Sequence, residues 1–340
     1  MRSTITIFAF ILNAMLWAQP RVLHFTRTSG FDHGTRSVSY AMFQGIAQEL
    51  GATVDDDQSG DPFSDPVALS QYAVIIFSNT SGNAILNAQQ RINFEAWVAN
   101  GGRVMGIHAA TDTYRHSAAN GNNTGTWDFY AELIGASVQE APNHVNGTPE
   151  YSMSHIGVHA STANLPEPWV KNEEYYYWED GYYGPDNMEV LRVEETVGPN
   201  GQVNSYDAPR PMSWYRTLPN GSRVFYTALG HAQSNFTSDL LFRAHIKDAL
   251  AWLLEGSTDI SAPSSISGFH AYPNPALDVL TILTDASWTG MPVQVLDTTG
   301  RVVLQGTISG ESTIISVNSL SEGTYVIRTQ ASAKSVRIIR

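Results

Sequence analysis

The sequence of 340 residues predicts an α/β domain with a doubly wound, mostly parallel sheet, followed by a small all-β domain. Three observations predict this organisation. Short apolar runs alternate with amphipathic helical segments over the first half of the chain. A segment rich in Ser and Pro, residues 257–266, is typical of a linker. Beyond it, short β-like runs follow one another with turn residues between them and no helical period.

The α/β pattern begins at Arg21 with alternating strands and helices. The helix expected over residues 35–52 has Val38, Met42, Ile46 and Leu50 on one face, and a glycine suits its end. The next helix has Asn87 as its candidate N-cap and Gly101 just past its last turn. We expect strands at 21–26, 72–78 and 103–109, and helices at 35–52, 87–102 and 126–136.

The middle of the chain is richer in strand-like runs. Two of these runs flank Pro219–Gly221, a turn signal that predicts a hairpin. An amphipathic helix over residues 238–256 then closes the domain. The expected strands lie at 150–159, 173–178, 188–195, 211–218 and 222–231, and the later β-like runs begin at 278, 292, 301, 312, 323 and 334.

Charge and composition exclude several classes of function. The net charge of −13 disfavours nucleic acid and anionic membrane surfaces as partners, but it leaves neutral ligands such as sugars open. The chain has no cysteine, which excludes thiol nucleophiles, disulfides and Cys-ligated metals. Covalent or metal chemistry would therefore depend on His, carboxylate, hydroxyl or Lys side chains.

Residues 1–18 have the pattern of an export signal. Arg2 gives a basic start, Ile5–Leu16 is mostly apolar, and Ala18 offers a small residue for cleavage before Gln19. A membrane anchor is the alternative, but the apolar run is too short to span a bilayer comfortably. No later segment is apolar enough to cross a membrane, so we expect a mature protein without a transmembrane segment.

Candidate catalytic residues follow the expected strands. In open α/β sheets, ligands bind outside the carboxyl ends of the strands. His33 follows the first strand, His108 ends the third with Asp112 four residues later, and His231 ends the last. Glu174 can reach the same edge. Imidazoles there can act as general bases, polarise a carbonyl or bind a metal, and a carboxylate can orient them. The alternative is that each is an ordinary loop histidine.

A dense run of aromatic residues surrounds Glu174. Tyr176 and Trp178 are candidates for a platform on which a sugar ring stacks, although core packing is the usual fate of such residues. No local metal-binding motif is present, so no metal ligand is assigned, and ligands would have to assemble across loops. The dinucleotide fingerprint and the G-x-S-x-G elbow are also absent.

The stretches RVLHFTRTSGFDHGT, NGGRVMGIHAATDT, NEEYYYW and GSRVFYTALGHAQ, in this order, resemble the ThuA-like (trehalose utilisation) domain. The resemblance implies a class I glutamine amidotransferase-like, flavodoxin-like fold over residues 20–256. In true amidotransferases the nucleophilic cysteine follows a strand at a tight elbow, and the equivalent stretch here reads Gly106-Ile107-His108, so amidotransferase activity is not expected. The resemblance also implies a role in trehalose-type or 3-keto sugar metabolism, and the implied catalytic residues are His33, His108, Asp112, Glu174 and His231.

The chain departs from the family pattern at three places. His33 is followed by Gly34 where the family usually has aspartate, and His159 is followed by Ala160 where it has proline. A second His-Pro pair is replaced by Arg210-Pro211, ahead of Trp214. These changes bear on the substrate, and we count Arg210 and Trp214 with Tyr176 and Trp178 as candidate substrate-binding residues.

The C-terminal stretches AYPNPALDVLTI, VQVLDTTGRVV and LSEGTYVIRT, with the basic end KSVRIIR, resemble the type A sorting domain of type IX secretion in Bacteroidota. The resemblance covers residues 267–340 and implies a small immunoglobulin-like β-sandwich. It also implies export across the inner membrane by the N-terminal signal and then across the outer membrane by the type IX machinery. The protein is then released or held at the cell surface.

These observations favour a secreted or cell-surface protein that acts on a carbohydrate or sugar derivative by His/Asp acid–base chemistry. A non-catalytic carbohydrate-binding module is the alternative, and a metal-dependent hydrolase is a second one. The sequence alone assigns no cofactor and leaves open whether the protein is an enzyme. The expected partners are a small carbohydrate or glycan and the type IX secretion machinery.

Overall fold

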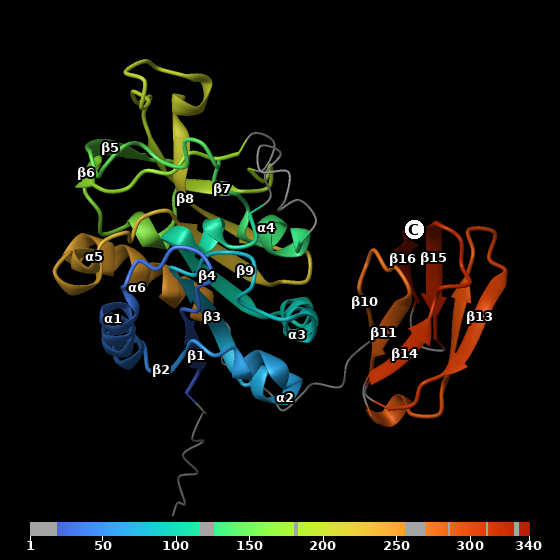
Figure 1. Ribbon diagram of the computed structural model, residues 1–340. Coiled ribbons are helices and arrows are strands. Elements are labelled where there is room, and N and C mark those ends of the chain that lie inside the picture. Colours follow the sequence, from blue (N-terminus) through green and yellow to red (C-terminus); the bar gives the residue numbers. More distant parts are fainter. Residues whose placement is uncertain are drawn as a thin grey trace, which may run out of the picture.

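The computed structural model describes residues 19–115, 126–179, 183–255, 269–284, 286–310, 312–329 and 333–340. The expected export signal (1–18) and linker (257–266) lie outside these residues. Figure 1 shows a large sheet flanked by helices, and a set of smaller sheets formed by the C-terminal residues. In the part of the chain that the structure describes, no helix combines the length and apolar character needed to cross a membrane.

The large sheet has nine strands in the order β2-β1-β3-β4-β9-β8-β7-β5-β6. The α/β prediction is confirmed, and the sheet is mixed, because the second half of the order is antiparallel. The parallel half consists of β2 (Thr53–Asp57), β1 (Arg21–Phe25), β3 (Tyr72–Ser78), β4 (Arg103–Ile107) and β9 (Arg223–Thr227). The antiparallel half consists of β8 (Arg210–Thr217), β7 (Met188–Val193), β5 (Glu150–His155) and β6 (Trp169–Asn172).

The strand expected at residues 173–178 does not form. β6 ends before it, and the segment instead pairs irregularly with the loop over residues 138–145 through bridges at Tyr176 and Trp178. The carboxylate of Glu173 accepts hydrogen bonds from the backbone of Gly230 and His231, in a distant loop. Isolated bridges and hydrogen bonds to a distant loop thus replace the ladder that the aromatic pattern predicted.

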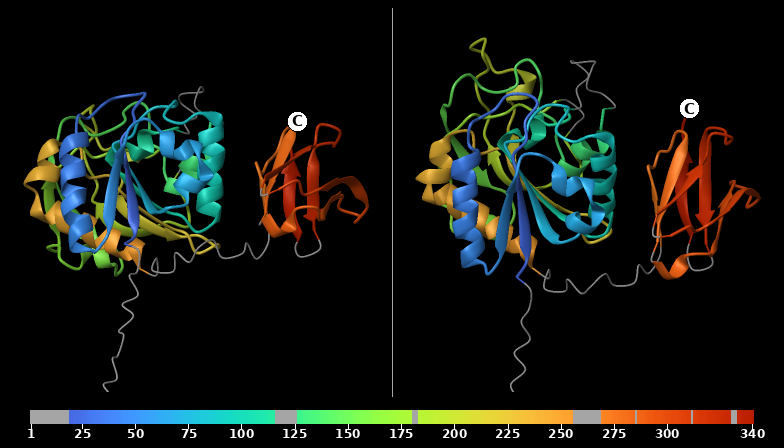
Figure 2. Two further views of the ribbon diagram at one scale, coloured as in Figure 1. Left: turned by 90° about the horizontal axis from the view of Figure 1, so that it is seen from below. Right: turned by 60° about the horizontal axis from the view of Figure 1, so that its bottom comes forward.

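Helices cover both faces of the sheet, as a doubly wound fold requires (Figure 2). The predicted caps are confirmed in part: Asn87 forms a capping box with Gln90, which pairs two backbone N–H groups of the first turn. One face holds α1 (Arg36–Glu49), α5 (Gln233–Thr237) and α6 (Leu240–Leu254); the other holds α2 (Pro66–Leu69), α3 (Ala88–Ala99) and α4 (Asp128–Ile134).

Gly106 allows α4 to pack closely on β4. A Cβ atom at this position would lie 2.5 Å from Ile134 Cδ1 and 2.9 Å from Tyr226 Cδ2. Both neighbours are fully buried and neither can move freely. A glycine is therefore needed at the penultimate residue of β4, which fixes this strand tip in the core.

The C-terminal residues form two antiparallel sheets around their own apolar core, which confirms the predicted small β-sandwich. Inward-facing side chains such as Leu280, Val295 and Ile327 are buried between the sheets. One sheet consists of β10 (His270–Tyr272), β11 (Val279–Leu283) and β14 (Ser312–Ser316). The other consists of β13 (Val302–Thr307), β12 (Pro292–Leu296), β15 (Gly323–Arg328) and β16 (Ala333–Ile338).

His159, at the start of the short helix η3 (Ala160–Thr162), and His245, on α6, are both buried. The ring of His159 stacks on Tyr215, with centroids 4.5 Å apart, and His245 Nδ1 donates a hydrogen bond to the Ser161 carbonyl. Burial lowers the pKa of His159 to about 4 and lowers that of His245 to about 4 as well. Both rings are therefore neutral in the folded protein at pH 7.

We expect the α/β domain to lose stability on acidification between about pH 6.5 and pH 4, because the unfolded chain binds protons there that the buried histidines exclude. His159→Asn retains a side-chain acceptor for the Ser161 N–H and removes one of these groups. Its free energy of unfolding, measured by urea titration at a series of pH values, should fall less steeply over this range. If the free energy of unfolding of the variant falls as steeply with pH as that of the native protein, His159 does not contribute to the loss of stability.

Candidate functional site

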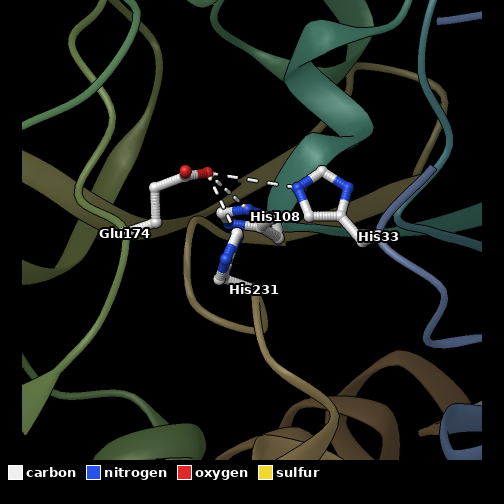
Figure 3. A group of neighbouring side chains, drawn as sticks. All are labelled: His33, His108, Glu174 and His231. Atoms are coloured by element: carbon white, nitrogen blue, oxygen red, sulfur yellow. Dashed lines mark hydrogen bonds and ion pairs between the residues drawn. The ribbon is translucent and has the colours of Figure 1, made fainter. Parts of the chain in front are cut away.

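Three histidines from distant parts of the chain meet at the carboxyl edge of the parallel strands (Figure 3). His33 lies in the loop after β1, His108 directly follows β4, and His231 follows β9. The ring centroids of His33 and His108 are 4.8 Å apart, those of His33 and His231 are 5.1 Å apart, and those of His108 and His231 are 5.3 Å apart.

Glu174 supplies a carboxylate to this cluster from the segment that follows β6. Its Oε2 atom lies 3.2 Å from His108 Nε2, 3.2 Å from His231 Nδ1 and 4.0 Å from His33 Nε2. A single oxygen atom thus faces three imidazoles, as the dashed lines in Figure 3 mark.

The backbone and neighbours of His108 fix its ring. Its φ angle of +47° is left-handed, a conformation that costs energy for a residue other than glycine and is concentrated at functional sites. Nδ1 donates to the Ala228 carbonyl at 2.6 Å, which leaves Nε2 facing Glu174 and the Tyr176 hydroxyl, 3.0 Å away. The Tyr176 ring stacks on the imidazole with centroids 4.4 Å apart.

The charges in the cluster depend on one another. Burial alone would raise the pKa of the Glu174 carboxyl, but its contacts with His108, His231 and His33 outweigh burial and hold the pKa well below its usual range. The contact with Glu174 raises the pKa of His231, whereas burial lowers the pKa of His33. Burial also raises the pKa of Tyr176 far above its ordinary value, so its hydroxyl stays neutral and can donate to His108.

The four side chains have the donor set and spacing of a metal site. One ligand atom from each of His33, His108, Glu174 and His231 lies within 4.8 Å of the others. Zinc ligands lie about 2.0–2.2 Å from the ion, so they are about 3–4 Å from one another, close to the distances from Glu174 Oε2. His231 Nδ1 is buried and has no hydrogen-bond partner, although it faces the carboxylate. Imidazole nitrogens around a carboxylate suit a divalent transition metal.

Asp112 lies at the end of the short helix η2 (His108–Asp112) and does not take the expected place beside the His108 ring. Its carboxylate pairs with Arg115 at 2.8 Å, and burial raises its pKa. Ala228 and Glu174 orient the His108 ring instead. The catalytic role of Asp112 stays a prediction.

Two of the predicted substrate-binding residues are buried, and their role in binding stays a prediction. Trp214 is fully buried and its indole N–H donates to the Ile134 carbonyl. Arg210 is also buried; its Nε donates to the Tyr176 carbonyl and its guanidinium lies over Tyr177. Both side chains pack the segment that carries Glu174, so neither offers a face to a ligand.

The two other candidates are also mostly enclosed. Tyr176 is only 3% exposed and supports His108. Trp178 is partly buried, and its indole N–H donates to the Pro211 carbonyl. Substrate contact by these two residues stays a prediction.

Two residues of the site were not predicted from the sequence. His144 Nε2 lies 3.3 Å from Glu174 Oε1, the oxygen that the other three histidines leave free. Phe31 is 66% exposed, and its ring lies 4.8 Å from that of His33. The sequence signal for Phe31 is that a large apolar residue stands in the otherwise polar loop GFDHG. His144 lies in a loop without periodicity, and no local signal marks it.

Glu174→Gln should lower the pKa of His231 in chelator-treated protein. The carboxylate charge that raises this pKa is removed while burial of the ring remains. NMR titration of the histidine ring protons measures the change, with the exposed Glu150→Gln as the matched control. An unchanged His231 pKa in Glu174→Gln would contradict the contact.

Two family models match the chain. The trehalose utilisation family, ThuA, matches residues 21–253, and a secretion system C-terminal sorting domain matches residues 270–339. None of the curated proteins compared with the chain matches it.

The chain is similar to several solved structures. A ThuA-like protein from Bacteroides uniformis has a TM-score of 0.53 at 19% identity, covering 75% of this chain and 96% of its own. One from Parabacteroides merdae has a TM-score of 0.47 at 18% identity, covering 68% and 90%. A glutamine amidotransferase from Thermotoga maritima has a TM-score of 0.40 at 11% identity, covering 71% and 99%. At 19% identity, the similarity to the Bacteroides uniformis protein shows a shared fold alone.

The sorting domain identifies the export route of this protein, which is type IX secretion to the cell surface or the extracellular space. The N-terminal match covers more than half of the chain and includes all four residues of the cluster. The chain therefore belongs to the trehalose utilisation (ThuA) family and carries a type IX sorting domain at its C-terminal end.

Proposed function

We propose that this secreted protein is a metal-dependent enzyme that acts on a carbohydrate or sugar derivative. The observation that carries the proposal is the set of four ligand atoms from His33, His108, Glu174 and His231, all within 4.8 Å of one another. A divalent ion bound there would polarise a substrate oxygen and lower the pKa of a bound water.

The residues around the four ligands have separate tasks. The Ala228 carbonyl holds the proton of His108 on Nδ1, so that the lone pair is on Nε2 and a metal ion there would take the place of the Tyr176 hydroxyl as its partner. The Tyr176 ring excludes water from one face of that imidazole. Asp112 lies near the cluster without being one of the ligands and is the candidate for acid–base catalysis.

Phe31 supports a sugar as the ligand class. Its exposed ring lies beside His33, and aromatic faces bind the apolar C–H faces of sugar rings while hydroxyl groups remain free for polar contacts. The description of the family, trehalose utilisation, points to the same class. Trehalose-type disaccharides and 3-keto-glycosides are therefore the first compounds to test.

Purified protein should contain a stoichiometric divalent metal, and Glu174→Gln or His231→Ala should lose it because each removes one of four ligands. Elemental analysis measures the content, and titration of chelator-treated protein with Co²⁺ measures the affinity. His155→Ala is the matched control, since His155 pairs with Glu167 at 2.9 Å outside the cluster. If Glu174→Gln and His231→Ala bind metal as well as His155→Ala does, the proposed metal site is rejected.

Turnover of a sugar should require the metal, and Phe31→Ala should raise KM about tenfold while metal content stays unchanged, since aromatic stacking contributes about 1 kcal/mol or slightly more. A kinetic screen over trehalose-type and 3-keto sugars tests this, with Phe31→Trp as the control that retains an aromatic face. Sugar binding that persists without metal and without turnover would instead identify a carbohydrate-binding module.

A further inference from the structure

Asn79 contacts all three loops that carry the histidines. It directly follows β3, which lies between β1 and β4 in the sheet. Its Nδ2 donates to Thr35 Oγ1 at 2.9 Å and to the Gly230 carbonyl at 3.0 Å, and its Oδ1 accepts from the Ala109 N–H at 3.3 Å. These three partners lie within two residues of His33, His231 and His108, respectively.

The loops need such a contact because their strands are far apart. β1 and β9 are separated by β3 and β4, and a strand spacing of about 4.8 Å places them about 14 Å apart. The rings of His33 and His231 are nevertheless 5.1 Å apart. Both loops therefore fold inward over the ends of β3 and β4, where the Asn79 amide lies.

Asn79 is suited to this position by its backbone and by its side chain. Its φ angle is +52°, in the left-handed region that asparagine tolerates better than most residues. The side chain is 3% exposed, and its amide supplies two donors and one acceptor group, all of which are used. Aspartate has nearly the same shape but lacks the two donors.

Glu173 is the nearest comparable residue. Its carboxylate accepts hydrogen bonds from the Gly230 and His231 N–H groups and from Asn235. Among the contacts of the described residues, these reach the loop after β9 but neither of the other two histidine loops. Unlike Glu173, Asn79 thus joins all three histidine loops to one another.

We propose that Asn79 is the positioning residue of the site, and that its side-chain amide holds the loops of His33, His108 and His231 in the arrangement that lets them bind one ligand. The role in metal binding rests on the function proposed above. The role in placing the three imidazoles does not, because it follows from the hydrogen bonds alone.

Two variants separate the side chain from the backbone. Asn79→Gly removes the amide and retains the left-handed backbone without strain, and Asn79→Asp retains the shape and removes both donors. Asn93→Ala is the matched control: Asn93 is 5% exposed and its Nδ2 donates to the Phe63 carbonyl, away from the cluster. Circular dichroism and thermal unfolding of the full chain confirm that each variant is folded.

The first measurement uses chelator-treated protein and the ¹⁵N NMR signals of the histidine rings. We expect the signals of His33, His108 and His231 to shift together in both Asn79 variants and to stay in place in Asn93→Ala. The second measurement is Co²⁺ affinity with the visible absorption spectrum of the bound ion. We expect at least a tenfold loss and an altered spectrum in the Asn79 variants only.

The outcomes distinguish the two proposals. If the native protein binds no Co²⁺ but the three ring signals shift together in the Asn79 variants, the metal site is rejected and the positioning role stands. If the ring signals of folded Asn79→Gly and Asn79→Asp match those of the native protein, the positioning role is rejected, whether or not Co²⁺ binds. Shifts of one histidine alone would also reject it, since Asn79 would then hold a single loop.

Discussion

The candidate site depends on one carboxylate oxygen, Glu174 Oε2, which three imidazoles face from three different loops. A partly buried carboxylate without a cationic partner is costly. Its contacts with the histidines keep the pKa of Glu174 low, so the charge persists inside the protein. The same contacts draw together nitrogens that would otherwise be separated by the width of several strands. The proposed metal would take the place at the centre of these contacts.

The fold supplies a rigid support for this arrangement. Gly106 lets β4 lie tightly under α4, and the next turn holds His108 in a left-handed conformation with its Nδ1 bound to the Ala228 carbonyl. Asn79 and Glu173 fix the neighbouring loops through buried hydrogen bonds. Ligands in such a site are positioned by packing and by polar contacts to backbone atoms, which is what a binding or catalytic centre requires.

The same chain carries this site and a domain that directs its export. The C-terminal sandwich is a sorting domain of type IX secretion, so the α/β domain works at the cell surface or outside the cell. A protein without cysteine has no thiol to oxidise there, and no metal that it binds can be held by thiolate groups. The four residues of the cluster are of these two types.

Most of the strands and helices, the N-cap at Asn87 and the β-sandwich followed from hydrophobic periodicity and turn residues, because these are local properties. The strands β2 and β6 were not expected from the sequence. The placement of His33, His108 and His231 at strand ends followed in the same way. Sequence could not identify the partners of these residues. The position of Glu174 depends on an irregular segment for which the residue pattern predicted a strand. Trp214 and Arg210 are buried by contacts with residues distant in sequence. The roles of His144, Phe31 and Asn79 likewise depend on which loops fold over which strands. Such contacts form between residues far apart along the chain, so only the tertiary structure decides them.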